Sequence, residues 1–160
     1  MTTRQALRGT RVLVVDDDPD DRELMERAAR RGGYETMSVR DGISAIEAIA
    51  WFEPDIVLVD WLLPDISGAE ICRRTADAVR VAGGPPRPRL VLVTARSDDL
   101  DVEIGLAHGA DAFVTKPVRR QRILDALSTA LACAGRPEPP PGERGGLQLL
   151  ARLQVRRRSG

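Results

Sequence analysis

The stretch Ile56-Val57-Leu58-Val59-Asp60 decides the fold, because four buried-type residues in a row end in a single carboxylate. A short apolar run of this kind, bounded by Pro54 and Pro64, predicts a strand that is covered on both faces. In open α/β sheets, chemistry takes place in the crevice outside the carboxyl ends of the strands. Asp60 is therefore expected where such a sheet carries its functional groups.

Three other apolar runs also end in chemically useful side chains. They are residues 12–15 before Asp16 and Asp17, residues 90–93 before Thr94, and residues 112–115 before Lys116. Helical patterns separate the runs, and strands that alternate with helices pair in parallel through right-handed crossovers. The sequence thus predicts an α/β protein with a doubly wound, five-stranded parallel sheet, flavodoxin-like, in the order 2-1-3-4-5.

The helical patterns also predict which residues cover this sheet. The first helix is expected to be capped by Asp18 with Pro19 at its first position. The expected inner faces are Leu24, Met25 and Ala28; Ile43, Ile46, Ile49 and Ala50; Cys72, Thr75, Ala76 and Val79; Leu100, Ile104 and Ala107; and Ile123, Leu124, Leu127 and Leu131. The polar run 34–39 is expected at a sheet edge.

Length and composition indicate one domain with short appendages. The chain has 160 residues, and 24 basic side chains balance 24 acidic ones, so its overall charge favours neither nucleic acid nor an acidic partner. We expect a leader over residues 1–9, the domain over 10–133 and a flexible Pro/Gly/Arg-rich tail over 134–160. The leader lacks an apolar core and no run is long enough to span a membrane, so a cytoplasmic protein is expected.

The acids at the strand ends predict a magnesium-dependent phosphoryl-transfer site. Asp16, Asp17 and Asp60 would repel one another unless a cation joined them, and Mg²⁺ takes carboxylates together with phosphate oxygens. Asp60 would act as the nucleophile, while Lys116 and Thr94 would hold the phosphoryl oxygens. Lys116 is the only lysine of the chain, which hints that an ammonium group is needed there.

The motifs that surround these residues resemble the receiver domain of two-component response regulators (CheY-like). They are Val-Val-Asp-Asp-Asp-Pro at 14–19, Pro-Asp-Ile-Val-Leu-Val-Asp at 54–60, Leu-Pro-Asp-Ile-Ser-Gly at 63–68, Val-Thr-Ala at 93–95, Gly-Ala-Asp-Ala-Phe-Val at 109–114 and Lys-Pro at 116–117. Each motif alone is weak, but their combination in this order is highly specific.

The resemblance implies that Asp60 accepts a phosphoryl group from a sensor histidine kinase or a histidine phosphotransfer protein. It implies that Asp16, Asp17, Asp60 and the backbone carbonyl of Leu62 bind Mg²⁺. Such a domain is not an enzyme beyond its own Mg²⁺-dependent phosphorylation and dephosphorylation.

The resemblance also implies a switch. Thr94 would move toward the phosphate and Phe113 would turn inward, which would remodel the surface of helix four, strand five and helix five. An unidentified downstream protein would bind there, and a homodimer through this surface is plausible. The Lys116-Pro117 peptide is usually cis in such domains.

Leu62 is apolar where some receivers carry a polar residue that orients the hydrolytic water, and bulky Arg96 follows two residues after Thr94. We therefore expect a long-lived phosphoryl group.

Two other functions compete with this interpretation. A haloacid-dehalogenase-type aspartyl-phosphate phosphohydrolase would carry its nucleophile after the first strand as Asp-x-Asp followed by Thr or Val, whereas Pro19 follows here. A flavin- or nucleotide-binding module needs phosphate donors after that strand, where this chain has carboxylates. The 27 residues after Cys133 are too few for a helix-turn-helix module, so no DNA-binding domain is expected.

Overall fold

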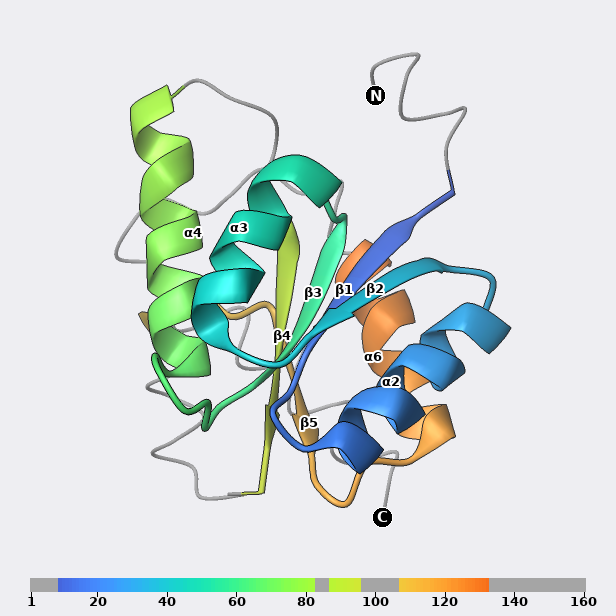
Figure 1. The fold of residues 1–160 in the computed structure, drawn as a ribbon. Helices are drawn as coiled ribbons and strands as arrows, with labels where there is room; N and C mark the ends of the chain where they lie inside the picture. Colours follow the sequence, from blue (N-terminus) through green and yellow to red (C-terminus); the bar gives the residue numbers. More distant parts are fainter. Residues whose placement is uncertain (1–8, 83–86, 96–106, 133–160) are drawn as a thin grey trace.

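The structure, a computed structural model, describes residues 9–82, 87–95 and 107–132 as one parallel sheet with helices on both faces (Figure 1). The strands are β1 (Arg11–Val15), β2 (Glu35–Val39), β3 (Ile56–Asp60), β4 (Arg89–Thr94) and β5 (Ala112–Thr115). They lie in the order β2-β1-β3-β4-β5, and every neighbouring pair is parallel. The fold class and the strand order predicted from the sequence are confirmed.

The central strand β3 is buried along its whole length, from Ile56 to Asp60. It pairs with β1 on one side and with β4 on the other, so each of its faces is covered by helices and each edge by a strand. The predicted edge strand is β2, whose residues are exposed or half-buried. This agrees with its more polar composition.

Within the described residues, two helices cover each face of the sheet (Figure 1). Helices α2 (Pro19–Arg31) and α6 (Arg120–Ala132) pack on one face, while α3 (Gly42–Phe52) and α4 (Gly68–Ala82) pack on the other. Asp18 caps α2 as predicted, because its carboxylate accepts hydrogen bonds from the amides of Asp20 and Asp21 at 2.8 and 3.2 Å. No helix in the described part of the chain is long and apolar enough to cross a membrane.

Several predicted features fall on residues outside the described ranges: the leader over residues 1–8, Arg96, the helix around Leu100 and Ile104, and Cys133 with the tail after it. Ala107, at the end of that predicted helix, is described and is exposed rather than facing inward. Cys72 is buried in the core between α4 and the sheet, in agreement with its place on the predicted inner face of this helix.

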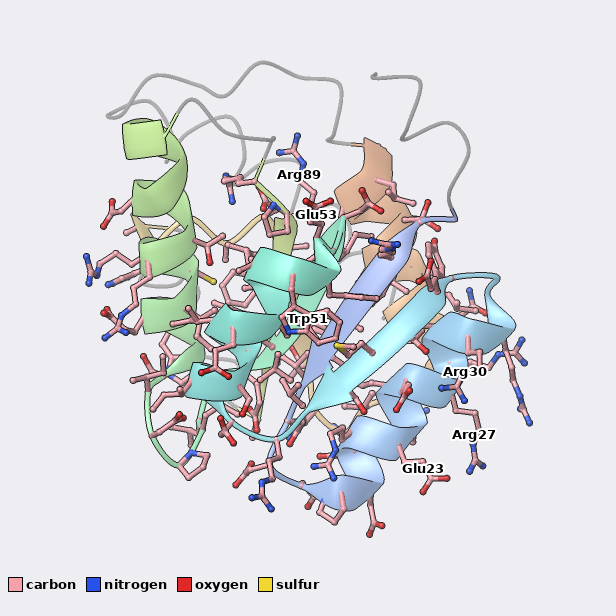
Figure 2. The ribbon with its side chains drawn as sticks, turned by 45° about the horizontal axis from the view of Figure 1, so that its top comes forward. Glu23, Arg27, Arg30, Trp51, Glu53 and Arg89 are labelled. Atoms are coloured by element: carbon pink, nitrogen blue, oxygen red, sulfur yellow. The ribbon has the colours of Figure 1, made fainter. Side chains whose placement is uncertain are left out.

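The predicted inner face of α3 is wrong by about one position. The buried residues are Gly42, Ala45, Ala48 and Phe52. Of the predicted inner-face residues, Ile43 is 58% exposed, Ala50 is exposed, and the two isoleucines between them are half-buried. This helix is apolar on nearly every side, so hydrophobic periodicity could not identify the inner face. Small alanines face the sheet, and Trp51 lies on the outside (Figure 2), 65% exposed.

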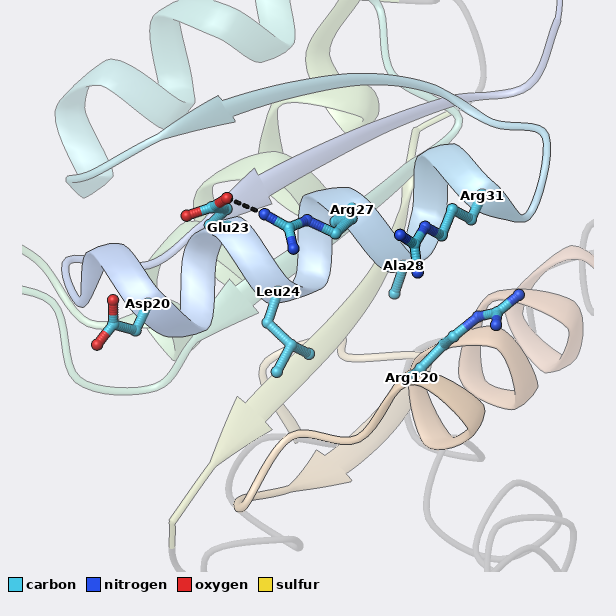
Figure 3. Close-up of a pocket in the computed structure, with 7 residues that line it drawn as sticks. All are labelled: Asp20, Glu23, Leu24, Arg27, Ala28, Arg31 and Arg120. Atoms are coloured by element: carbon cyan, nitrogen blue, oxygen red, sulfur yellow. Dashed lines mark hydrogen bonds and ion pairs between the residues drawn. The ribbon is translucent and has the colours of Figure 1, made fainter.

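The prediction for α2 is wrong at one residue, Leu24. Met25, Ala28 and Ala29 are buried against the sheet and α6, but Leu24 is 39% exposed. It lines an open, largely charged pocket of about 270 Å³ beside α6, together with Asp20, Glu23, Arg27, Ala28, Arg31 and Arg120 (Figure 3). Met25 points into the core, whereas Leu24, which points about 100° away from it around the helix, lies on the open flank of α2 beside α6.

Candidate functional site

The residues that follow the strands meet at the carboxyl edge of the sheet because backbone hydrogen bonds continue past the strand ends. The Asp16 amide donates to the Val39 carbonyl at 3.2 Å, and the Lys116 amide donates to the Thr94 carbonyl at 2.8 Å. These bonds keep the loops in register with the strands. The side chains of Asp16, Asp60 and Lys116 meet at this edge, and Thr94 ends the neighbouring strand at the same edge; that they act together stays a prediction.

Three carboxylates crowd together at this edge. Asp16, Asp17 and Asp60 each offer one oxygen, and the three oxygens lie within 4.8 Å of one another. Asp16 is fully buried and Asp60 is 7% exposed, whereas Asp17 is exposed. A compact set of carboxylate oxygens that opens to solvent on one side fits a hard divalent cation such as Mg²⁺. Three of the four predicted metal ligands, Asp16, Asp17 and Asp60, are thus close together in the structure.

The surroundings disfavour negative charge on two of these acids. Burial raises the pKa of Asp16 to about 6, and the nearby Asp60 adds to the effect, against hydrogen bonds from the Asp18 amide and Lys116. Burial likewise raises the pKa of Asp60, although Lys116 and the Leu62 amide oppose it. A bound cation would offset the free-energy cost of keeping Asp16 and Asp60 negatively charged in this site. The crowding itself therefore favours metal binding.

Leu62 contacts Asp60 through its backbone amide, which donates to Asp60 Oδ1 at 3.3 Å. This bond holds the carboxylate and orients the start of the loop after β3. The Leu62 side chain is 63% exposed. That its carbonyl is a metal ligand stays a prediction.

Lys116 reaches into the acid cluster from the loop between β5 and α6. Its Nζ atom lies 2.9 Å from Asp21, 3.1 Å from Asp16 and 3.3 Å from Asp60. Burial alone would lower the pKa of Lys116, but the contacts with Asp21, Asp16 and Asp60 raise it above its ordinary value. The ammonium is therefore charged at any physiological pH. The Lys116-Pro117 peptide is cis, as the resemblance implied.

Asp21 is the residue of this site that the sequence prediction missed. In the sequence it is one of several acids near the positive end of the first helix, where acidic residues are common. Side chains on a helix point back toward its N-terminus, and α2 begins beside the carboxyl end of β1. Acids in this turn are therefore candidates for the site, but only the structure distinguishes Asp21, which contacts Lys116, from its exposed neighbour Asp20.

The two predicted switch residues lie where the sequence placed them. Thr94 ends β4 and is 3% exposed, one residue beyond the position that pairs with Asp60. Phe113 on β5 is half-buried and packs against the apolar cluster on the α3 and α4 face. The movement of Thr94 toward a phosphate and the inward turn of Phe113 stay predictions.

Gly68 allows α4 to begin directly against the end of β3. Its amide donates to the Trp61 carbonyl at 2.9 Å. A Cβ atom on Gly68 would come closer to the Asp60 carbonyl oxygen than side-chain carbons are found to approach, and it would also press on Leu92. The backbone of Asp60 is therefore held in place by a contact that only glycine permits.

We expect Gly68→Ala to lower the free energy of unfolding by about 2 kcal/mol, as overpacking of a tight contact does. The displaced backbone would be that of Asp60, so Mg²⁺ affinity should fall as well. Urea unfolding and a Mg²⁺ titration measure the two effects. An alanine variant with unchanged stability and affinity would contradict this account of Gly68.

Comparison with known proteins agrees with this site. Residues 12–128 match the response regulator receiver domain family. The chain is 36% identical to the DNA-binding response regulator MtrA of Mycolicibacterium smegmatis over 133 residues, which are 83% of this chain and 54% of that protein. The chain thus spans about half the length of the curated relatives it matches.

Solved structures give the same result. The signal receiver domain of the response regulator NarL from Mycobacterium tuberculosis is 33% identical, with a TM-score of 0.67 over 81% of this chain and 99% of that one. The response regulator DrrB of Thermotoga maritima, an OmpR/PhoB homologue, is 27% identical, with a TM-score of 0.68 over 78% of this chain and 54% of that one. The receiver domain of DrrB has also been solved in a BeF₃-activated form.

Neither the phosphohydrolase nor the nucleotide-binding alternative accounts for these matches. The family is one of signalling domains rather than of enzymes that turn over a substrate. A parallel sheet in the order β2-β1-β3-β4-β5, an acid cluster at its carboxyl edge and the match over residues 12–128 lead to one conclusion: the chain belongs to the response regulator receiver domain family.

Proposed function

We propose that this receiver domain accepts a phosphoryl group on Asp60 from a sensor histidine kinase or a histidine phosphotransfer protein. The observation that carries the proposal is the placement of one lysine among three carboxylates at the strand ends, with Lys116 Nζ 3.3 Å from Asp60 Oδ2. Asp60 is the member of the acid cluster that ends the central strand, and it keeps 7% exposure whereas Asp16 is fully buried.

The reaction is a transfer between two protein side chains. An oxygen of the Asp60 carboxylate attacks the phosphorus of phosphohistidine, the phosphorus–nitrogen bond breaks, and the imidazole nitrogen leaves with the bonding electron pair. Lys116 and Thr94 bind the phosphoryl oxygens and stabilise their charge. Asp16, Asp17, Asp60 and the Leu62 carbonyl would hold a Mg²⁺ ion, which would supply further charge neutralisation when bound.

Phosphorylation by a small molecule tests the proposal without the cognate kinase. The full chain is incubated with acetyl phosphate, with and without Mg²⁺, and its mass is measured. We expect one phosphoryl group per chain that requires Mg²⁺ and maps to the peptide containing Asp60. No mass gain, or a modification at another residue, would contradict the assignment.

The output of the domain also belongs to this proposal. Phosphorylation moves Thr94 toward the phosphate and turns Phe113 inward, and the surface around β5 and α6 then binds a downstream protein or a second copy of the chain. Residues 10–133 form the receiver unit, and the protein acts in the cytoplasm. The tail predicted over residues 134–160 lies outside the described residues. The chain spans about half the length of its curated relatives. Identifying the downstream protein that binds this surface would define the output of the domain.

The Leu62 side chain is expected to lengthen the lifetime of the phosphoryl group. It lies next to the acceptor strand, is 63% exposed, and offers no polar group to orient a hydrolytic water. Leu62→Asn should shorten the half-life of the phosphorylated state about tenfold, equivalent to about 1.4 kcal/mol in the barrier. Decay of the phosphorylated mass over time measures this, and an unchanged half-life would sink the idea.

A further inference from the structure

We propose that Asp21 is a positioning residue for the phosphoryl-transfer reaction: its carboxylate anchors the Lys116 ammonium at the site throughout the reaction. The inference rests on the proposed function and goes beyond it, because Asp21 does not belong to the acid cluster that could hold a metal.

The contact between Asp21 and Lys116 is the shortest that the ammonium makes. Lys116 Nζ lies 2.9 Å from Asp21 Oδ2, compared with 3.1 Å for Asp16 and 3.3 Å for Asp60. An ammonium has three N–H donors, so one carboxylate is available for each. The Lys116 side chain is 18% exposed and that of Asp21 is 32% exposed, which places the pair at the rim of the site rather than in free solvent.

The three contacts differ in what happens to them during the reaction. Asp16 and Asp60 belong to the set whose oxygens lie within 4.8 Å of one another, so their oxygens would coordinate a bound cation. Asp60 also gives up an oxygen to phosphorus. Asp21 takes part in neither event. Its contact with Lys116 is therefore the one that can persist while the ammonium turns its other donors toward the phosphoryl oxygens.

An anchor is needed because lysine is a flexible side chain. Holding such a side chain in one rotamer costs conformational entropy, and the ammonium acts as a point charge without the rigid fork of arginine. Asp21 itself is placed by the first turn of α2, whose amides are capped by Asp18. The helix therefore fixes the position of Asp21, and Asp21 in turn holds the Lys116 ammonium in place.

Removing the Asp21 charge distinguishes positioning from simple repulsion, since the two effects have opposite signs. If Asp21 acted only as a negative charge near the site, Asp21→Asn would reduce repulsion of the anionic phosphoryl donor and speed up phosphorylation. If Asp21 anchors Lys116, the same variant slows phosphorylation. The expected effect is about a tenfold lower maximal rate with acetyl phosphate, with the half-saturating donor concentration changed much less.

Asp20→Asn is the matched control. Asp20 is the exposed neighbour of Asp21 in the same helical turn, and it forms no ion pair with Lys116. The substitution Asp20→Asn therefore removes the same charge without removing a contact of Lys116. In the reaction with acetyl phosphate, the bond between the Asp60 oxygen and phosphorus forms. The bond between phosphorus and the acetyl oxygen breaks, and acetate leaves with its electrons.

Asp21→Glu, which keeps the charge, should recover part of the rate. All three variants are compared with the wild type in saturating Mg²⁺.

A second measurement uses the single lysine of the chain. Protein labelled with ¹³C and ¹⁵N on lysine alone gives one side-chain signal, which reports the mobility of Lys116 directly. In the wild type and Asp20→Asn the Lys116 Cε methylene should be motionally restricted, and in Asp21→Asn it should approach the mobility of a free lysine side chain.

The outcomes separate this inference from the proposed function. Phosphorylation of Asp21→Asn at or above the rate of Asp20→Asn, or an equally restricted Lys116 in both, overturns the role of Asp21. If the wild type accepts no phosphoryl group, the proposed function fails, whereas the lysine signal still decides whether Asp21 holds Lys116.

Discussion

Asp60→Asn is expected to abolish phosphorylation by acetyl phosphate altogether. The amide keeps the size of the side chain and can still accept a hydrogen bond from the Leu62 amide, which lies 3.3 Å from Asp60 Oδ1 in the wild type. It lacks the anionic oxygen that attacks phosphorus. It also removes one of the three carboxylates that could hold a cation, so Mg²⁺ affinity should fall as well.

The same substitution should not unfold the protein. Burial raises the pKa of Asp60, which means that the folded protein disfavours the negative charge there. Without Mg²⁺, Asp60→Asn is therefore expected to be at least as stable as the wild type in urea unfolding. The control is Asp20→Asn, which should be phosphorylated normally. A phosphorylated Asp60→Asn protein would show that another residue accepts the group, and an unfolded variant would show that the carboxylate is structural.

Asp16 should make the stability of the metal-free protein decrease between about pH 4 and pH 6. Its pKa rises from 3.8 in the unfolded chain to about 6 in the folded one, so in this window the folded state binds more protons. Its contribution to the free energy of unfolding is then fully present below pH 3.8 and is lost as the pH rises through 6. The loss amounts to at most about 3 kcal/mol.

Comparison with Asp16→Asn isolates this effect. Asp18 and Asp65 have lowered pKa values, chiefly through hydrogen bonds from backbone amides that outweigh the burial of Asp65, and they contribute stability that is lost as the pH falls. Subtracting the urea-unfolding curve of Asp16→Asn from that of the wild type removes these contributions. A difference that stays constant from pH 4 to pH 7 would rule out the raised pKa of Asp16.

Adding Mg²⁺ should reverse the trend. The cation binds the carboxylates in their charged form, so it stabilises the folded protein above pH 6 and progressively less below it. At a concentration 100 times the dissociation constant the gain is about 2.7 kcal/mol. The Asp16→Asn variant should show a smaller gain at every pH.

Much of this protein follows from the amino-acid sequence because its signals are local. The apolar run 56–59 and its counterparts give the strands, and the alternation of strands with helices gives the parallel sheet, since few topologies satisfy the crossover rule. Residues that directly follow strands must meet at one edge of such a sheet. For that reason the sequence alone predicts one site that contains Asp16, Asp60, Thr94 and Lys116.

The tertiary structure alone decided the features that depend on which way a side chain faces. Helix α3 is apolar all round, so only packing against the sheet could show that Ala45 and Ala48 face inward and Ile43 outward. The ion pair of Asp21 with Lys116 joins α2 to the loop after β5, residues far apart in the chain whose distance no local pattern encodes. Sequence periodicity specifies elements and their order, whereas contacts between elements depend on how they pack in three dimensions.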